Sequence, residues 1–347
     1  MRAMLLCLAT LAASWADGPE PALQRFEFRQ AAMGTSVRIV LYAAGTETAE
    51  AAADSAFERV HELDSALSDY NPDGELLRVC AEAAGGAPVP VSEDLWRVLW
   101  RAQEISREAD GALDVTISPV VRLWRQARTL KRMPDPARIQ EALARVGYQF
   151  LRLDTGHHSI QFLRPNMRID LGAIAKGYVA DEALCALTDA GVACALVDAG
   201  GQISMGDAPP GADGWRVAVA SLDPEEKPES YLVLSNATVA TSGDAHQALE
   251  IDGVRYSHIV DPRTGIGLTG RRSVTVVAPD GMTSDGWATA LCVLDPKEGL
   301  ERLRAERGTA SLYVRDLGRG EETYASAGWA RLVAEGCVKR ATLDGPR

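Results

Sequence analysis

The chain has 347 residues, enough to bury a sizeable core in one large domain or two smaller ones. Hydrophobic residues make up 46% and charged residues 24%, the ordinary balance of a globular protein. Lys and Arg number 36 against 48 Asp and Glu, and the resulting net charge of -12 argues against nucleic acid as a partner. An anionic substrate would need local positive charge, a metal ion, or both.

The N-terminal segment predicts export. Arg2 precedes an apolar run at 3–13, and residues 14–16 (Ser-Trp-Ala) give the small-x-small pattern of a cleavage site. We therefore expect a signal peptide at 1–16, a linker at 17–27, and an exported protein located in the periplasm. An ordinary first helix is the alternative. No later stretch reaches the ~18 apolar residues of a membrane span, so we expect no transmembrane span in the mature chain.

Five of the six cysteines follow this segment, at irregular spacing and without a Cys-x-x-Cys pair. An odd number in this arrangement argues against both a disulfide framework and a zinc site. We expect most of these cysteines to be small buried residues.

Helix and strand patterns alternate along the chain. Helices are predicted at 46–68, 92–109, within 128–147 after a charged loop, at 173–190, and as a pair over 284–306. Strands are predicted at 36–42, in "VACALVDAGG" (192–201), in several segments between 215 and 278, and in a hairpin-like end. No internal repeat is present. The predicted class is α+β, with a mainly antiparallel sheet core and flanking helices.

The stretch "IDLGAIAKGYVADEA" predicts an anion site. Asp170 ends a strand, Gly172 allows a ligand to approach the backbone, and a helix begins near Ala173 with Lys176 in its first turn. Free amides at a helix N-terminus together with a lysine suit a phosphate. A capped helix with a surface lysine is the alternative.

In "TSDGWATAL", Asp285 and Thr289 stand four residues apart at the start of a helix and so share one face. A carboxylate and a hydroxyl are hard oxygen ligands, suited to Mg²⁺ with phosphate oxygens in its other positions. The alternative is that Ser284 or Asp285 only caps the helix. His258, in "RYSHIVDPRTG", is by itself more typical of a structural histidine than of a catalyst.

Eight short stretches occur in a characteristic order along the chain: "MGT" (33–35), "SDYNPDGEL", "GALDVTISPVVRLW", "IDLGAIAKGYVAD", "VDAGGQISMGD", "TSGD", "RYSHIVDPRTG" and "TSDGWATAL". Together they resemble the ApbE family, the Mg²⁺-dependent FAD:protein FMN transferases. The resemblance covers residues 28–335 and leaves 336–347 as a C-terminal tail. It implies an ApbE-like, T-fold-related architecture.

This resemblance implies a role for individual residues. The implied FAD contacts are Met33, Tyr70, Ala112, Leu113, Asp114, Asp170, Lys176 and Ile259. The implied Mg²⁺ ligands are Asp285, Thr289 and the backbone carbonyl of Ala173, where a glycine is frequent in the family. Because that ligand is a carbonyl, the methyl group of Ala173 should matter little.

The reaction implied by the resemblance attaches the FMN half of FAD to a threonine of an acceptor protein and expels AMP. A threonine hydroxyl is a poor nucleophile until a base takes its proton. His258 is the candidate base, and Asp261 either orients it or shares the task.

The resemblance further implies that the acceptor is an exported or membrane redox protein with the motif Asp-x-x-Ser/Thr-Gly-Ala-Thr. Three alternatives remain: a FAD pyrophosphatase that releases FMN and AMP, a non-catalytic exported flavin-binding protein, and a solute-binding protein. Tyr70 favours transfer over hydrolysis, because asparagine accompanies hydrolysis at that family position. The lack of two similar α/β halves argues against a solute-binding protein.

Overall fold

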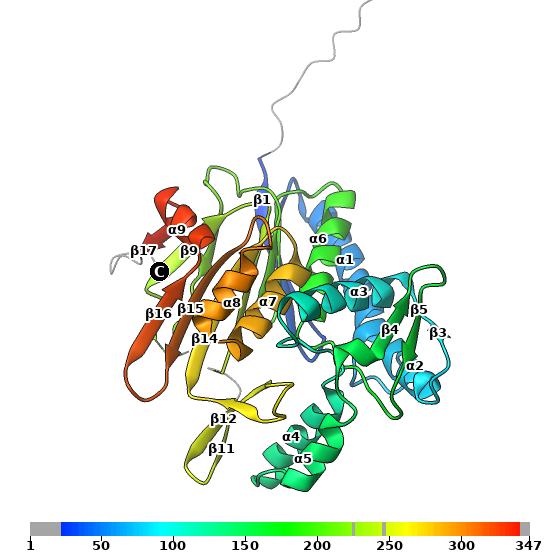
Figure 1. The fold of residues 1–347 in the computed structure, drawn as a ribbon. Coiled ribbons are helices and arrows are strands. Elements are labelled where there is room, and N and C mark those ends of the chain that lie inside the picture. Colours follow the sequence, from blue (N-terminus) through cyan, green and yellow to red (C-terminus); the bar gives the residue numbers. More distant parts are fainter. Residues whose placement is uncertain (1–21, 224–225, 245–247, 341–347) are drawn as a thin grey trace, which may run out of the picture.

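The computed structural model describes residues 22–223, 226–244 and 248–340, so the predicted signal peptide lies outside the described residues. Its centre is an eight-stranded sheet, in the order β1-β2-β6-β7-β10-β14-β15-β16, in which all neighbouring strands are antiparallel (Figure 1). The strands are β1 (Gln24–Ala32), β2 (Thr35–Ala43), β6 (Ala195–Ala199), β7 (Gln202–Met205), β10 (Ala237–Gly243), β14 (Arg271–Ala278), β15 (Ala310–Asp316) and β16 (Glu321–Ala325). The predicted α+β class with a mainly antiparallel sheet is confirmed.

Three small antiparallel sheets surround the large one. They are formed by β11 (Ala248–Ile251), β12 (Val254–Val260) and β13 (Gly267–Thr269); by β17 (Val338–Arg340), β9 (Ser230–Leu234) and β8 (Trp215–Ala218); and by β3 (Val89–Pro90), β5 (Ser159–Phe162) and β4 (Leu151–Asp154). β1 thus begins inside the stretch predicted as a linker, and β17 lies in the predicted C-terminal tail.

The helices match most of the sequence predictions. They are α1 (Thr46–Leu67), α2 (Glu75–Ala83), α3 (Glu93–Glu108), α4 (Ser118–Leu130), α5 (Pro136–Leu143), the short 3₁₀ helix η1 (Tyr148–Phe150), α6 (Ala175–Asp189), α7 (Gly281–Val293), α8 (Pro296–Leu303) and α9 (Ala327–Ala334). The sequence analysis did not predict α2, α4 and α9. α7 begins before Ser284 because Asp280 caps it, with Asp280 Oδ1 accepting a 2.9 Å hydrogen bond from Thr283 N.

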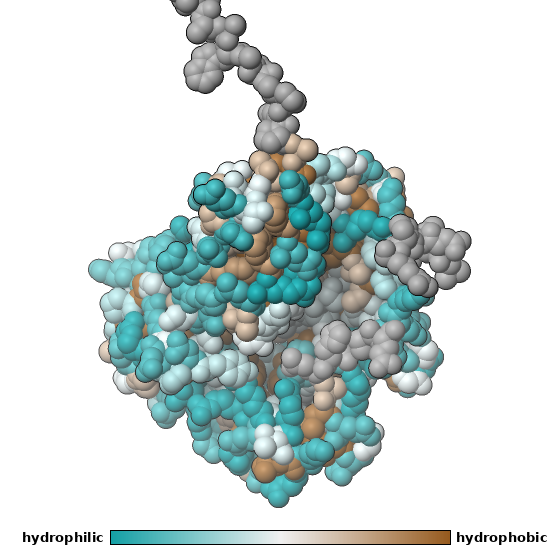
Figure 2. Space-filling view, turned by 180° about the vertical axis from the view of Figure 1, so that it is seen from behind, coloured by the Kyte–Doolittle hydropathy of each residue, from teal (hydrophilic) through white to brown (hydrophobic). Residues whose placement is uncertain are grey.

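The large sheet separates two hydrophobic cores. Val274 and Val276 of β14 point into the core shared with α1, α6 and α7, whereas Val277 belongs to the core under β8, β9 and α9. This alternation follows from the two-residue period of a strand. The surface opposite the view of Figure 1 is mostly hydrophilic (Figure 2). No helix in the described part of the chain is both long and apolar enough to cross a membrane.

α4 and α5 pack against β12 rather than against the large sheet (Figure 1). Val120 and Trp124 of α4 share a core cluster with Val260 of β12. Trp124 Nε1 also donates a 2.8 Å hydrogen bond to Gly265 O, in the turn that follows β12. This packing fixes the strand that carries His258.

The cysteine prediction is only partly met. Cys80 and Cys292 are buried, Cys194 and Cys337 are partly buried, and Cys185 is exposed. All five are free thiols.

Candidate active site

α6 and α7 approach each other through a pair of glycines. A Cβ atom on Gly177 would lie 2.0 Å from Gly281 O, and one on Gly281 would lie 2.2 Å from Gly177 O. Asp181 of α6 holds the same crossing, because its Oδ2 accepts a 2.6 Å hydrogen bond from Gly281 N at the start of α7. Only residues without a side chain allow this contact, which brings the first turn of α6 beside Asp285.

Asp285 lies at the centre of this crossing and is 1% exposed. Its Oδ2 accepts a 3.1 Å hydrogen bond from Gly177 N, and its Oδ1 accepts a 2.6 Å bond from Gln202 Nε2. Lys176 Nζ is 3.9 Å from Oδ2. Burial raises the pKa of Asp285, and the positive charge of Lys176 opposes that rise. The carboxylate is therefore surrounded by donors, and Lys176 forms its one ion pair within the described residues.

Oxygen atoms suited to a hard cation gather beside this carboxylate. Thr289 follows Asp285 by one turn of α7, and its hydroxyl lies 3.2 Å from Ser242 Oγ of β10. Ala173 is half-buried just before α6. Gln202 Oε1 is buried and has no hydrogen-bond partner among the residues the structure describes. A carbonyl oxygen left unpaired beside a buried carboxylate fits a site that a cation or its water ligand completes.

The donor set also limits the kind of metal. In the described ranges, no three His, Cys, Asp or Glu side chains come together as a metal-binding group. One carboxylate with hydroxyl and carbonyl oxygens suits Mg²⁺, which keeps few protein ligands and takes phosphate oxygens for the rest. The predicted Mg²⁺ ligands Ala173, Asp285 and Thr289 therefore fit that ion.

Lys176 connects the cation site with the other predicted FAD contacts. Its Nζ donates a 2.6 Å hydrogen bond to Gly172 O, and Gly172 N donates a 2.9 Å bond to Asp170 Oδ1. Asp170 Oδ2 accepts a 3.0 Å bond from Arg125, whose guanidinium lies over the Tyr70 ring at 4.6 Å. The Tyr70 side chain is 70% exposed, so a flat ligand can stack on it.

The remaining predicted FAD contacts are mostly buried or hydrogen-bonded to the protein. Met33 occupies a two-residue turn with Gly34, both at positive φ, and its N–H donates to Asp64 Oδ2. Leu113 packs against Gly286 of α7, directly after Asp285. The carboxylate oxygens of Asp114, which follows the buried Ala112 and Leu113, accept bonds from Thr116 and from Tyr148 N, which leaves its side chain a structural role.

The candidate bases lie on a different element. His258 is exposed on β12, Ile259 next to it is buried in the main core, and β12 contacts α7. Asp261 follows the strand, and its two carboxylate oxygens accept bonds of 3.0 Å from Arg263 Nε and Nη2. Asp261 is thus engaged by an arginine, whereas His258 lies at the surface.

The structure connects Tyr70, Asp170, Lys176, Asp285 and Thr289 through direct contacts or one shared neighbour. It also adds residues to which the sequence analysis gave no role, namely Arg125, Gln202 and Ser242. The last two stand in the quoted stretches "VDAGGQISMGD" and "TSGD". A polar side chain at a buried strand position was the available signal for Gln202.

The start of α6, with Lys176 in its first turn, thus lies beside the buried Asp285 carboxylate on a largely antiparallel α+β fold. Comparison with known proteins identifies the family. A family model described as "ApbE family" matches residues 33–313, and this chain belongs to that family. The resemblance found in the sequence is confirmed.

Two relatives illustrate the extent of the match. The protein named "FAD:protein FMN transferase" from Salmonella typhimurium is 32% identical over 336 residues, which cover 94% of this chain and 95% of that one. The protein of the same name from Vibrio cholerae is 30% identical over 345 residues, which cover 96% and 100% of the two chains.

Solved structures give the same result. The apo form of the Pseudomonas stutzeri flavinyl transferase ApbE is similar with a TM-score of 0.78 at 28% identity, covering 90% of this chain and 97% of that one. The flavin transferase ApbE from Vibrio cholerae gives a TM-score of 0.79 at 29% identity, covering 89% and 99%.

Proposed function

We propose that this protein is a FAD:protein FMN transferase that attaches FMN from FAD to a threonine hydroxyl of an acceptor protein, with Mg²⁺ as cofactor and AMP as product. The observation that most supports this proposal is the buried Asp285 carboxylate, which lies 3.9 Å from Lys176 and one helical turn from Thr289 in a member of the ApbE family. Relatives that match nearly the whole chain have the name of this activity.

Asp285, Thr289 and the Ala173 carbonyl would hold Mg²⁺. Bound there, the ion would neutralise charge on the pyrophosphate and on the departing phosphate. Lys176 contributes a positive charge from the first turn of α6, where the helix N-terminus also favours an anion. In this chain of net charge -12, these groups place positive charge where FAD needs it.

The covalent step breaks the phosphoanhydride bond of FAD and forms one phosphoester bond to the acceptor. The acceptor hydroxyl oxygen bonds to the FMN-side phosphorus, the bond from that phosphorus to the bridging oxygen breaks, and AMP leaves with the bond's electron pair. A protein base takes the hydroxyl proton. We assign that role to His258, because both oxygens of Asp261 are already hydrogen-bonded to Arg263. Asp261 then shapes the turn after β12.

The flavin half of FAD would lie near Tyr70, whose exposed ring is backed by Arg125. An aromatic face of this kind can stack on an isoalloxazine ring. Asp170 and Met33 would border the same ligand. Hydrolysis of FAD is the second candidate activity, and Tyr70 favours transfer because asparagine accompanies hydrolysis at that family position.

We also propose that the protein is exported to the periplasm through the signal peptide at 1–16. The acceptor would then be an exported or membrane redox protein with the motif Asp-x-x-Ser/Thr-Gly-Ala-Thr.

The test is incubation of the protein with FAD, Mg²⁺ and a domain carrying that motif, followed by intact-mass measurement of the acceptor and chromatography for AMP. Transfer makes the acceptor heavier by the mass of FMN less one water and releases one free AMP per modification. The control acceptor has the final threonine of the motif replaced by valine and should gain no mass. AMP with free FMN and an unmodified acceptor would identify a hydrolase instead, and intact FAD would identify a binding protein.

A further inference from the structure

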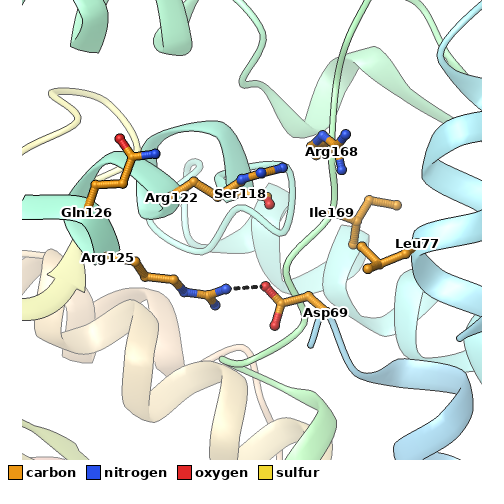
Figure 3. Close-up of a pocket in the computed structure, with 8 residues that line it drawn as sticks. All are labelled: Asp69, Leu77, Ser118, Arg122, Arg125, Gln126, Arg168 and Ile169. Atoms are coloured by element: carbon orange, nitrogen blue, oxygen red, sulfur yellow. Dashed lines mark hydrogen bonds and ion pairs between the residues drawn. The ribbon is translucent and has the colours of Figure 1, made fainter. Parts of the chain in front are cut away.

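A polar pocket lies between α4 and the segment that precedes Asp170. It has a volume of about 480 Å³. Its lining consists of Asp69, Leu77, Ser118, Arg122, Arg125, Gln126, Arg168 and Ile169. Figure 3 shows Ser118, Arg122 and Arg168 in the upper part of the pocket and the ion pair between Arg125 and Asp69 in the lower part. None of these residues belongs to the predicted Mg²⁺ or FAD sets.

The local fold builds this pocket from three residues of one helix face and one residue of a neighbouring segment. Ser118, Arg122 and Arg125 are spaced by four and three residues on α4, so they point the same way. Arg168 joins them because its backbone pairs with that of Ile117, immediately before Ser118. The arginines are thus held together by helix geometry and by a backbone bridge rather than by chance surface proximity.

The charges in the pocket are not balanced. Arg125 is bound by two carboxylates, at 2.5 Å from Asp69 and 3.0 Å from Asp170. By contrast, neither Arg122 nor Arg168 forms an ion pair with any residue in the described part of the chain. Arg122 and Arg168 therefore face a shared space without an ion-pair partner in the described part of the chain, and the three arginines of the cluster exceed its two carboxylates, Asp69 and Asp170, by one charge.

Ser118 points to a ligand independently of the arginines. The residue is only 4% exposed, it lines the pocket, and its hydroxyl has no hydrogen bond to any described residue. Its hydroxyl opens into the pocket rather than into the core, so an oxygen of a ligand can reach it. Ser118 is also the first residue of α4, and its N-cap Ile117 offers no side-chain cap, so the positive end of the helix faces the same region.

We propose that this pocket binds the phosphate group of a small phosphate monoester. Such a group has a charge of about −2 at neutral pH and three acceptor oxygens, which matches the guanidinium groups of Arg122 and Arg168 and one hydroxyl donor. Leu77 and Ile169 supply an apolar wall for the organic part of the ligand, and the volume lies in the range of small-molecule sites.

The test is calorimetric titration of the full-length protein with inorganic phosphate and with AMP, in phosphate-free buffer containing EDTA. EDTA removes any contribution from the proposed Mg²⁺ site. The variant Arg122→Gln/Arg168→Gln should raise the dissociation constant for phosphate at least tenfold. Both side chains are exposed and without ion pairs, so the variant should keep the parent's circular dichroism and melting temperature. Ser118→Ala should weaken binding by a smaller factor.

The matched control is Arg128→Gln/Arg132→Gln, which removes the same charge from exposed positions at the end of α4 that do not line the pocket. It should bind phosphate as the parent does. AMP binding tighter than phosphate would identify a nucleoside monophosphate as the occupant, and equal binding would identify the phosphate group alone. The proposal is overturned if Arg122→Gln/Arg168→Gln binds phosphate like the parent, or if the control loses as much affinity. No turnover is measured, so this result is independent of the proposed transferase activity.

Discussion

Replacing Gly177 with alanine tests whether the close approach of α6 and α7 builds the cation site. In an isolated helix this change stabilises by about 1 kcal/mol, because alanine is the better helix former. In the protein, the new Cβ would lie 2.0 Å from Gly281 O and 2.3 Å from Gly281 C, and backbone atoms cannot rotate away. Overpacking of a core costs about 1–3 kcal/mol, occasionally more. Because the backbone clash is severe, we expect the upper end of that range, which after the gain of about 1 kcal/mol leaves a net loss of up to about 2 kcal/mol, opposite in sign to the intrinsic preference.

The same displacement should damage the site. Relief of a 2.0 Å contact requires a shift of more than about an ångström, since carbon atoms pack at about 3.5–4.0 Å. Such a shift would break the 3.1 Å bond from Gly177 N to Asp285. We expect Gly177→Ala to lose most of the stabilisation that Mg²⁺ gives the parent protein.

Urea unfolding monitored by circular dichroism, with and without Mg²⁺, measures both effects as changes of midpoint at constant slope. The control is Gly85→Ala, where a Cβ would meet no atom within 4 Å and φ is not positive. It should stay within about 1 kcal/mol of the parent. The reasoning is refuted if Gly177→Ala is as stable as the parent or more stable.

Three further variants test individual residues. Asp285→Asn should fold, because a rotated Gln202 amide can accept a hydrogen bond from the new amide through its unpaired Oε1. Mg²⁺ should no longer raise the melting temperature of this variant. An unchanged response to Mg²⁺ would show that Asp285 is not a ligand. His258→Asn should keep FAD affinity within about threefold while transfer, followed by acceptor mass, falls at least about 10²-fold; near-parental transfer would exclude His258 as the base. Burial raises the pKa of Asp181 to about 6, so its protonated native form stabilises the fold below pH ~4 and this contribution is lost as the pH rises to about 6. Asp181→Asn should remove this decrease of the unfolding free energy with rising pH, which urea titrations measure and which is at most about 1.4 kcal/mol per pH unit. An unchanged pH dependence would assign it to another group.

Local patterns were sufficient to predict much of the fold. The alanine-rich helix α1 buries Ala49, Ala56, Phe57 and Leu63 at helical spacing, and its predicted bounds agree with the structure to within a residue. α2 was missed although Leu76, Val79, Cys80 and Ala83 have the same periodicity, because the turn-forming "SDYNPDGE" precedes it. α4 was missed for a similar reason, since Gly and Pro lie near its start.

The site was harder to predict because its geometry is tertiary. Nothing local in sequence places Lys176 near Asp285; the contact depends on two glycines, Gly177 and Gly281, that stand 104 positions apart. Capping was a reasonable alternative for Asp285 until the structure placed the cap at Asp280. The arginine pocket was harder still to predict from the sequence, because Arg168 is brought to α4 by the pairing of its backbone with that of Ile117.

The burial of Asp285 is the feature of this site that most needs a cation. A carboxylate that is 1% exposed and, in the described part of the chain, paired only with Lys176 at 3.9 Å is already costly to ionise, as its raised pKa indicates. A pyrophosphate beside it would add two further negative charges. Lys176 can offset one of these three charges, and a divalent ion can offset the other two. On the proposed function, FAD and Mg²⁺ therefore bind as a coupled pair, and each raises the affinity for the other by the same factor.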